Sequence, residues 1–341
     1  MIADHTVPFA VARAGQAQRL AESIAAVIPV VSRLATTGDL SGPGPVFVGI
    51  GASHAAACAP VWMLRTRGIH SWRLGAGEHP LPFPRSHHPL VGVSQSGRSA
   101  ETLAALESVD PRLRYAVVNR TPSPIADAAA IVVDIGNIPD SYASTIGYTA
   151  TVAALGILAD AWDGGIIDPG WAHLPDVLRT TEQLLAAPVT RLAKVFGQAR
   201  SADFVGAGPS VGSAEAAALL FREVARVPAT GMSTRQYLHG SMESAGDTVH
   251  VLFGDGRESE VAATLAGAGH QVILVTSEDV APGRNLATAR LPSCPPVQRV
   301  ILEALAMQIL VAAVAEQRAV EIEEFVFHNS DTKVPAGTTP E

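Results

Sequence analysis

One stretch decides the fold: Leu90-Val91-Gly92-Val93, followed at once by Ser94-Gln95-Ser96-Gly97-Arg98-Ser99. The first four residues form a short apolar run that predicts a buried strand. A stretch of helical length, from Ser99 to Val109, comes directly after the small-residue turn. A buried strand that leads through a tight turn into a helix is half of a βαβ unit, so we expect a parallel sheet.

Similar apolar runs flank this stretch and alternate with segments of helical length. The alternation predicts an α/β fold in which parallel β-sheets are flanked by helices, a three-layer sandwich of the flavodoxin-like or Rossmann-like kind. A helical segment of residues 1–35 is expected before the first strand. The predicted strands span residues 45–50, 90–93, 115–118 and 131–133, and a further helix spans 53–67.

The second half of the chain repeats the plan of the first. Gly49-Ile50-Gly51-Ala52-Ser53 recurs as Gly206-Ala207-Gly208-Pro209-Ser210 at an offset of 157 residues, and Gly97-Arg98 recurs as Gly256-Arg257 at an offset of 159. Repeated landmarks at nearly one offset indicate two copies of one α/β unit. We predict a first domain over residues 36–165 and a second over 172–341, joined by a Gly/Pro-rich linker near 164–170.

Composition excludes several classes of function. Of the 341 residues 48% are hydrophobic and 16% are charged, and the formal net charge of −8 argues against a nucleic-acid partner. Two widely spaced cysteines favour a reducing compartment. No run of about 18 uninterrupted apolar residues is present, and Met1–His5 does not begin a signal-peptide pattern. We therefore expect a cytoplasmic protein with no membrane partner.

The loop of residues 94–99 is predicted to bind a phosphate. At the start of a helix, free N–H groups and the macrodipole attract an anion, and several serine hydroxyls can donate to it. The alternative is that Ser94 and Ser96 only cap the helix. The second copy carries Asp255 and Glu258 at the equivalent place, where they would repel a phosphate. We expect one phosphate site per chain, in the first copy.

Other sites are weaker hypotheses. The Gly49-Ile50-Gly51 turn lacks the third glycine of a dinucleotide fingerprint, since His54 takes its place. Gly92-Val93-Ser94-Gln95-Ser96 lacks the final glycine of a hydrolase elbow. His79, His87 and His88 lie in a proline-rich connection without the framework of a metal site. We predict neither a cofactor nor a metal.

The pattern Gly-x-Gly-x-Ser, followed about forty residues later by Ser-Gln-Ser-Gly-x-Ser, resembles the sugar isomerase (SIS) domain. The tandem arrangement is similar to the isomerase half of glucosamine-6-phosphate synthase (glutamine-fructose-6-phosphate aminotransferase). It is also similar to stand-alone relatives such as fructosamine-6-phosphate deglycases and a class of glucosamine-6-phosphate deaminases. The resemblance covers roughly residues 30 to 335. It implies that phosphate and sugar contacts fall on Ser53, Ser94, Gln95, Ser96 and Ser99.

The same resemblance implies three catalytic residues. Arg222-Glu223, followed sixteen residues later by His239-Gly240, is similar to the family segment that holds a catalytic Glu and a ring-opening His. The segment around Lys333 resembles the tail that brings a Lys to the sugar carbonyl. In the family the His comes from the partner subunit, which implies a homodimer. A buried Glu whose pKa approaches neutrality can move a proton between C1 and C2 of a sugar.

Each of these residues also has a structural interpretation. Glu223 could form a surface pair with Arg222, His239 could be structural, and Lys333 could be solvated. Two family charges are absent, because Leu220 replaces a Lys and Gln236 replaces an acidic residue. Residue 2 is Ile2 and not the Cys of a glutaminase domain, so we expect a glutamine-independent activity.

The sequence therefore predicts an isomerase or deaminase that acts on a ketose or amino-sugar 6-phosphate. The alternatives are a fructosamine-6-phosphate deglycase, a sugar-phosphate sensor without catalysis, or, more weakly, an enzyme with a nucleotide cofactor on a Rossmann-like sheet.

Overall fold

The computed structural model describes residues 6–197, 199–327 and 329–335. By their contacts these residues form two compact units. The first comprises residues up to Asp140, Ile146–Pro175 and the tail from Val326, and the second comprises Ser141–Thr145 and Asp176–Phe325. Met1–His5, Ile2 included, and the predicted tail residues 336–339 lie outside the described residues.

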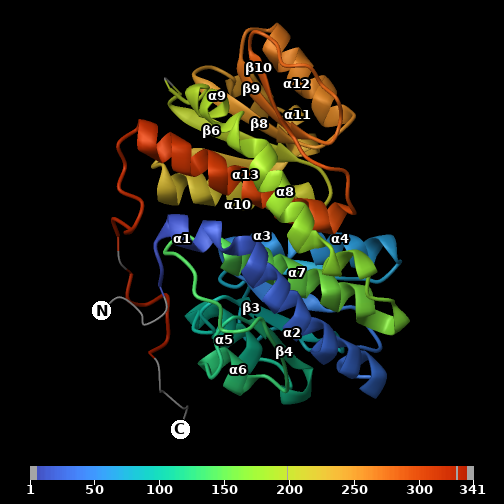
Figure 1. Ribbon diagram of the computed structural model, residues 1–341. Helices are drawn as coiled ribbons and strands as arrows, with labels where there is room; N and C mark the ends of the chain where they lie inside the picture. The colour runs from blue at the N-terminus through green and yellow to red at the C-terminus, as the bar shows by residue number, and fades with distance from the viewer. Residues whose placement is uncertain (1–5, 198, 328, 336–341) are drawn as a thin grey trace. The chain divides into compact units, whose positions relative to one another are not determined.

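The first unit is built on a parallel five-stranded sheet in the order β2-β1-β3-β4-β5. Figure 1 labels two of its strands, β3 and β4. The predicted apolar strands are confirmed as four of its members, and all of its pairings are parallel. The unpredicted member is an edge strand whose residues are only partly buried, so it carries no apolar run. The strands are β1 (Val46–Gly49), β2 (Trp72–Gly75), β3 (Leu90–Ser94), β4 (Arg114–Val118) and β5 (Ile131–Asp134).

Helices cover both faces of this sheet. The crossovers after β3 and β4 place α5 and α6 on one face, where they pack on each other. The crossover after β1 runs the other way, so α3 and α4 lie on the opposite face with α2 and α7. The helices are α1 (Phe9–Ala14), α2 (Gln16–Thr37), α3 (Ala52–Ala56), α4 (Cys58–Thr66), α5 (Ala100–Glu107), η1 (Pro111–Leu113), α6 (Pro124–Ala128), α7 (Ile146–Ala161), η2 (Trp162–Gly164) and η3 (Pro169–Ala172).

The second unit repeats this topology, with the order β10-β9-β8-β6-β7. Taken in chain order, its five strands occupy the same places as those of the first sheet, which confirms the internal repeat. The strands are β6 (Ser201–Gly206), β7 (Ala229–Ser233), β8 (Thr248–Phe253), β9 (Gln271–Thr276) and β10 (Leu286–Arg290). The helices are α8 (Leu174–Ala186, which starts in the first unit), α9 (Val189–Lys194), α10 (Ser210–Val224), α11 (Thr234–Leu238), η4 (Ser241–Ser244), α12 (Arg257–Gly267) and α13 (Pro296–Gln317).

The turns after the first strand of each copy are alike in backbone geometry. Gly51 has φ +57° and Gly208, its counterpart in the repeat, has φ +56°. Gly97 and Gly256 also match, with φ of +64° and +59°. This left-handed region favours glycine, which explains why these glycines recur at nearly one offset.

The contacts divide the chain differently from the domain boundaries predicted from the repeat. Residues 166–175 belong to the first unit, where Trp171 is buried and its indole N–H donates to Asp160 Oδ2 at 2.7 Å. The tail from Val326 also belongs to the first unit, although the sequence places it after the second copy.

Two helices, α2 and α13, are long and apolar enough to cross a membrane by length and composition alone. In α13 78% of the most apolar window is buried inside the protein, and in α2 28% is buried. A buried core helix passes the same test, so the two helices are weak evidence for a membrane span.

Candidate active site

The serine loop, residues 94–99, connects β3 to α5 as predicted. Ser94 ends the strand and is only 2% exposed, and its Oγ lies 3.2 Å from Oγ of Ser99. Gly97 turns the chain in the left-handed region, and a Cβ at this position would collide with the side chain of Ser123. Glycine at this position therefore permits the tight turn and the close approach of Ser123.

The hydroxyls of the loop do not cap the helix. Ser99 occupies the N-cap position of α5, yet its side chain accepts no capping hydrogen bond. Ser96 Oγ accepts only from the N–H of Arg98 within the turn, at 3.3 Å. Below the loop, Thr102 Oγ1 is buried and has no partner among the described residues. The N-cap residue of α5 is thus Ser99 and not Ser94 or Ser96, and the hydroxyl of Ser96, which only accepts in the turn, retains its hydrogen for a ligand.

The serine loop lies at the switch point of the first sheet. From β1 the chain crosses to β2 on one side, and from β2 it returns to β3 on the other side. In open α/β sheets ligands bind in the crevice at the carboxyl ends of such neighbouring strands. Ser53, in the first turn of α3, follows β1 and so belongs to the same edge. Gly49 permits this close approach, because its Cβ would lie 3.1 Å from both Ser53 Cβ and Val93 O.

The tail pairs with the serine loop. Lys333 forms an antiparallel bridge with Ser99, and the N–H of Ala100 donates to Thr332 O at 3.2 Å. Arg98 O accepts from the N–H of Val334 at 2.9 Å, and Arg98 Nε donates to Val334 O at 2.7 Å. Val334 also packs against the core between α5 and the sheet. The predicted Lys333 is therefore held beside the predicted phosphate loop, and its own side chain is exposed.

Glu223 lies in the last turn of α10, partly buried. Burial raises the pKa of its carboxyl from 4.5 to about 7, although the nearby Arg226 opposes this shift. Arg226 is occupied elsewhere, since Nη1 donates to Glu223 O at 2.5 Å and Nη2 to Glu324 O at 2.7 Å. The surface pair with Arg222 does not form, because Arg222 Nε donates to Ala229 O.

The raised pKa of Glu223 predicts how stability changes with pH. The folded state holds the proton more tightly than the unfolded chain, so this contribution is full below about pH 4.5 and is lost as pH rises to about 7. Denaturant unfolding at pH 4.5 and 7.5 should show that Glu223→Gln loses less stability over this range than the wild type. An equal loss in both proteins would contradict the raised pKa.

His239 follows α11 as its C-cap residue, exposed to solvent. α11 is anchored to the core through Tyr237, whose Oη lies 2.9 Å from Nδ1 of the buried His250. Among the described residues no hydrogen bond or ion pair joins His239 to Glu223. Gln236 is exposed on the same short helix.

Leu220 is buried and lies one turn before Glu223 on α10. Side chains three residues apart on a helix are neighbours, so a Lys here would pair with Glu223 and lower the pKa of the carboxyl. Leu220 instead adds apolar surroundings. Leucine in place of the family's lysine is therefore compatible with a pKa near neutrality for Glu223.

The sequence hypotheses missed a polar network in the second unit. Arg299 and Glu303, one turn apart on α13, are joined by a bond of 2.9 Å from Nε to Oε1, and Arg299 also pairs with Asp255. The expected repulsion between Asp255 and a ligand overlooked this arginine. The spacing of four residues on a helix predicts the pair of Arg299 and Glu303, but it does not predict the contact with Asp255.

Two of the three histidines of the proline-rich connection contact backbone carbonyls. His79 Nδ1 lies 3.2 Å from Gly75 O and His88 Nδ1 lies 2.6 Å from Gly44 O. Within the part of the chain that the structure describes, no group of three or more His, Cys, Asp or Glu side chains could hold a metal ion.

Comparison with known proteins finds relatives that are similar in sequence to part of this chain. The chain is 32% identical over 217 residues to a glutamine–fructose-6-phosphate aminotransferase (isomerizing) of Symbiobacterium thermophilum, with 59% of the chain and 35% of that protein covered. It is 25% identical over 297 residues to the enzyme of the same name from Bradyrhizobium diazoefficiens, with 80% and 49% covered. The chain thus spans between a third and a half of these relatives. No protein-family model matches.

Solved structures resemble the whole fold. The C-terminal domain of glucosamine-fructose-6-phosphate aminotransferase from Francisella tularensis superposes with a TM-score of 0.80 at 16% identity, covering 95% of this chain and 100% of that one. This chain has the fold of that C-terminal domain. Tagatose-6-phosphate ketose/aldose isomerase from Escherichia coli gives a TM-score of 0.74 at 15% identity, with 91% and 92% covered. Glucosamine-6-phosphate deaminase from Thermotoga maritima gives 0.69 at 15%, with 91% and 96% covered. At these identities the structural likeness shows the fold alone.

Proposed function

We propose that this chain is a tandem SIS protein and an enzyme that acts on a ketose or amino-sugar 6-phosphate, by isomerisation with or without loss of amine. One observation carries the proposal: the serine loop stands at the switch point with the tail residue Lys333 bridged to Ser99. This bridge supports a site in which the serine loop binds an anion and Lys333 supplies an amine at the same edge of the sheet. The names of the relatives and of the similar structures support a phosphosugar substrate.

In the proposed reaction Ser53, Ser94, Gln95, Ser96 and Ser99 hold the phosphate and adjoining sugar hydroxyls. His239 would move the anomeric proton to the ring oxygen, which opens the ring. Glu223 would take the proton from one of the carbons C1 and C2 and return it to the other. A carboxyl whose pKa is about 7 exists in both protonation states near neutral pH, as this shuttle requires. Lys333 would engage the carbonyl, where a Schiff base acidifies the adjacent C–H.

The proposal includes a homodimer in the cytoplasm in which one copy supplies His239 to the site of its partner. Mixing an inactive Ser96→Asp variant with an inactive His239→Ala variant tests this arrangement. If His239 crosses between copies, one site of each mixed dimer contains both intact residues, and activity returns after the subunits exchange. If His239 serves its own chain, no mixed site is whole in this way and activity stays absent.

The function is tested by turnover of a substrate panel. The panel contains the 6-phosphates of fructose, glucosamine, fructosamine and tagatosamine, each assayed with and without glutamine, and we expect glutamine to change nothing. A product from at least one member supports the enzyme, and turnover of fructosamine 6-phosphate alone would identify a deglycase. Binding of a sugar phosphate without any turnover would instead favour a sensor, for which the uncharged Leu220 and Gln236 are the observations in support.

A further inference from the structure

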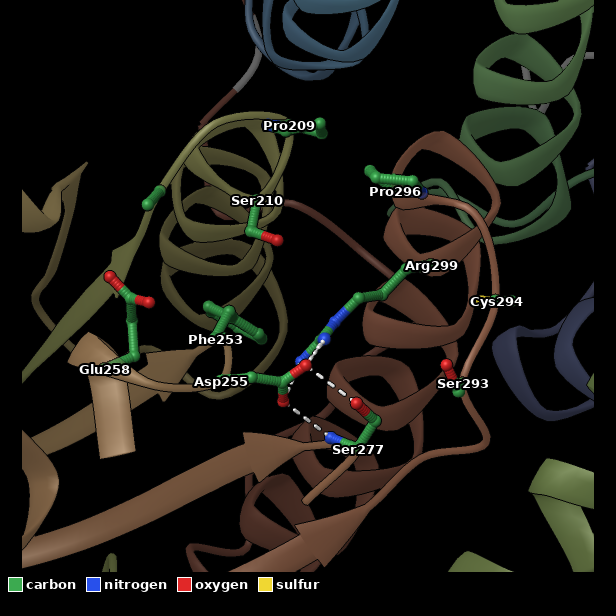
Figure 2. A pocket seen from close by; sticks show the side chains of 12 residues that line it. Pro209, Ser210, Phe253, Asp255, Glu258, Ser277, Ser293, Cys294, Pro296 and Arg299 are labelled. Carbon is green, nitrogen blue, oxygen red and sulfur yellow. Dashed lines mark hydrogen bonds and ion pairs between the residues drawn. The ribbon is translucent and has the colours of Figure 1, made fainter. Parts of the chain in front are cut away.

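The second unit contains a cavity of about 300 Å³ at the carboxyl ends of its strands (Figure 2). It opens between the turn after β6, which leads to Ser210, and the turn after β8, which carries Asp255. In this sheet β6 lies between β8 and β7. The chain crosses from β6 to β7 on one side and then returns to β8 on the other side of β6. The cavity between the ends of β6 and β8 therefore lies at the switch point of this sheet. Ligands of α/β sheets bind at this place.

The cavity does not suit a phosphate, because the one arginine that lines it, Arg299, is already paired with the carboxylate of Asp255. Asp255 forms two bonds with Arg299, at 2.6 and 3.2 Å, and accepts from Thr276 Oγ1, Ser277 Oγ and the Ser277 N–H at 2.6 to 2.8 Å. These partners hold the pKa of Asp255 well below its usual range in spite of partial burial. Arg299 also donates to Glu303. The guanidinium charge is thus neutralised within the protein.

The polar groups that remain around the cavity are mainly acceptors. Ser210 Oγ donates its hydrogen to Glu303 Oε1 at 2.9 Å, and Ser277 Oγ donates to Asp255, so both hydroxyls can present only lone pairs. Glu258 is 6% exposed and lines the cavity, and its Oε1 accepts from Thr234 Oγ1 at 2.6 Å. Among the described residues nothing donates to its Oε2, which lies where a Cβ of Gly254 would stand.

The charge of this site is therefore acidic. Asp255 and Glu303 both pair with the guanidinium of Arg299, and burial raises the pKa of Glu303. Glu258 lines the cavity with a neutral donor, Thr234, as its side-chain partner. A buried carboxyl is costly unless a cation or several donors satisfy it. A ligand that fits must donate hydrogen bonds and carry positive charge, and a cavity of this volume has room for one small molecule.

We propose that the second unit carries a separate binding site for a small polyhydroxylated amine, of the amino-sugar class without phosphate. Its ammonium pairs with Glu258 and its hydroxyls donate to Ser210 and Ser277. The site does not depend on the reaction proposed above.

Calorimetric titration of the full chain with glucosamine tests this site. We expect saturable binding, at least tenfold weaker binding of the uncharged sugars glucose and N-acetylglucosamine, and no competition by inorganic phosphate. Glu258→Gln should weaken glucosamine binding at least tenfold. Ser293→Trp should do the same by filling the cavity, since Ser293 is exposed at its rim and its loss disturbs no bond that the structure shows.

A matched change in the first unit separates the two sites. Ser96→Leu alters the serine loop and should leave glucosamine affinity within twofold. Thermal melting confirms that each variant is folded, and Ser293→Trp keeps the test valid if Glu258→Gln does not fold. The proposal is overturned if glucosamine does not bind at 10 mM, if folded Ser293→Trp binds it unchanged, or if Ser96→Leu abolishes the binding.

Discussion

Replacing Glu223 by Gln is expected to lower kcat on the active sugar phosphate by about 10²–10⁴-fold, which is the usual contribution of a general acid–base group. The amide keeps the size of the side chain but cannot take up and return a proton. Since the carboxyl acts on C–H bonds and not on the phosphate, the Kd of the substrate should stay within twofold. Steady-state kinetics and calorimetry measure the two quantities.

The pH profile adds a second readout for Glu223. With a pKa of about 7, activity that needs the ionised carboxylate should rise with pH through neutrality in the wild type. Glu316→Gln is the matched control, because Glu316 is exposed near the end of α13 and should leave kcat unchanged. If Glu223→Gln retains wild-type kcat, Glu223 is not the proton shuttle.

Replacing Ser96 by Asp is expected to weaken binding of the sugar 6-phosphate at least a hundredfold. The new carboxylate would stand in the serine loop beside the incoming phosphate. Two like charges about 4 Å apart repel by roughly 4 kcal/mol at the effective dielectric of a protein surface, and a hundredfold change in Kd is only about 2.7 kcal/mol. Calorimetric titration at constant ionic strength measures the effect.

The control for this charge is Ser41→Asp, since Ser41 is exposed in a loop of the same unit. It adds the same charge away from the serine loop and should change Kd less than twofold. Equal weakening by both variants would mean that net charge, and not the loop, decides the affinity. Unchanged binding in Ser96→Asp would remove the phosphate from the serine loop.

The features that the sequence predicted well are local ones. A buried parallel strand needs an uninterrupted apolar run, so Leu90–Val93 marks β3 without any tertiary information. The serine loop and its left-handed glycine follow from adjacent residues, and the repeat follows from glycines that the backbone of each copy requires. For Glu223, proton transfer between carbons requires a pKa near neutrality, and burial on α10 raises the pKa of its carboxyl to about 7, while its catalytic role stays a prediction.

Contacts between segments that are distant in sequence could not be predicted from local sequence patterns. Ser99 and Lys333 are joined by a bridge of backbone hydrogen bonds, which carries no side-chain signature in the sequence. The edge strand β2 is half-exposed and so lacks an apolar run. Asp255 looked repulsive because its partner Arg299 is distant in sequence and becomes its neighbour only when β8 and α13 pack in one unit.

The pairing of the tail with the serine loop also has a consequence for the order of folding during synthesis. The ribosome must make residues 176–325 after the first sheet and before the tail. At typical elongation rates these residues take roughly 8–30 s. During that interval the nascent first unit lacks Thr332 and Val334, whose backbone groups pair with those of Ala100 and Arg98. The backbone pairing of the loop that is proposed to bind substrate therefore forms only after the chain has passed through the whole second copy.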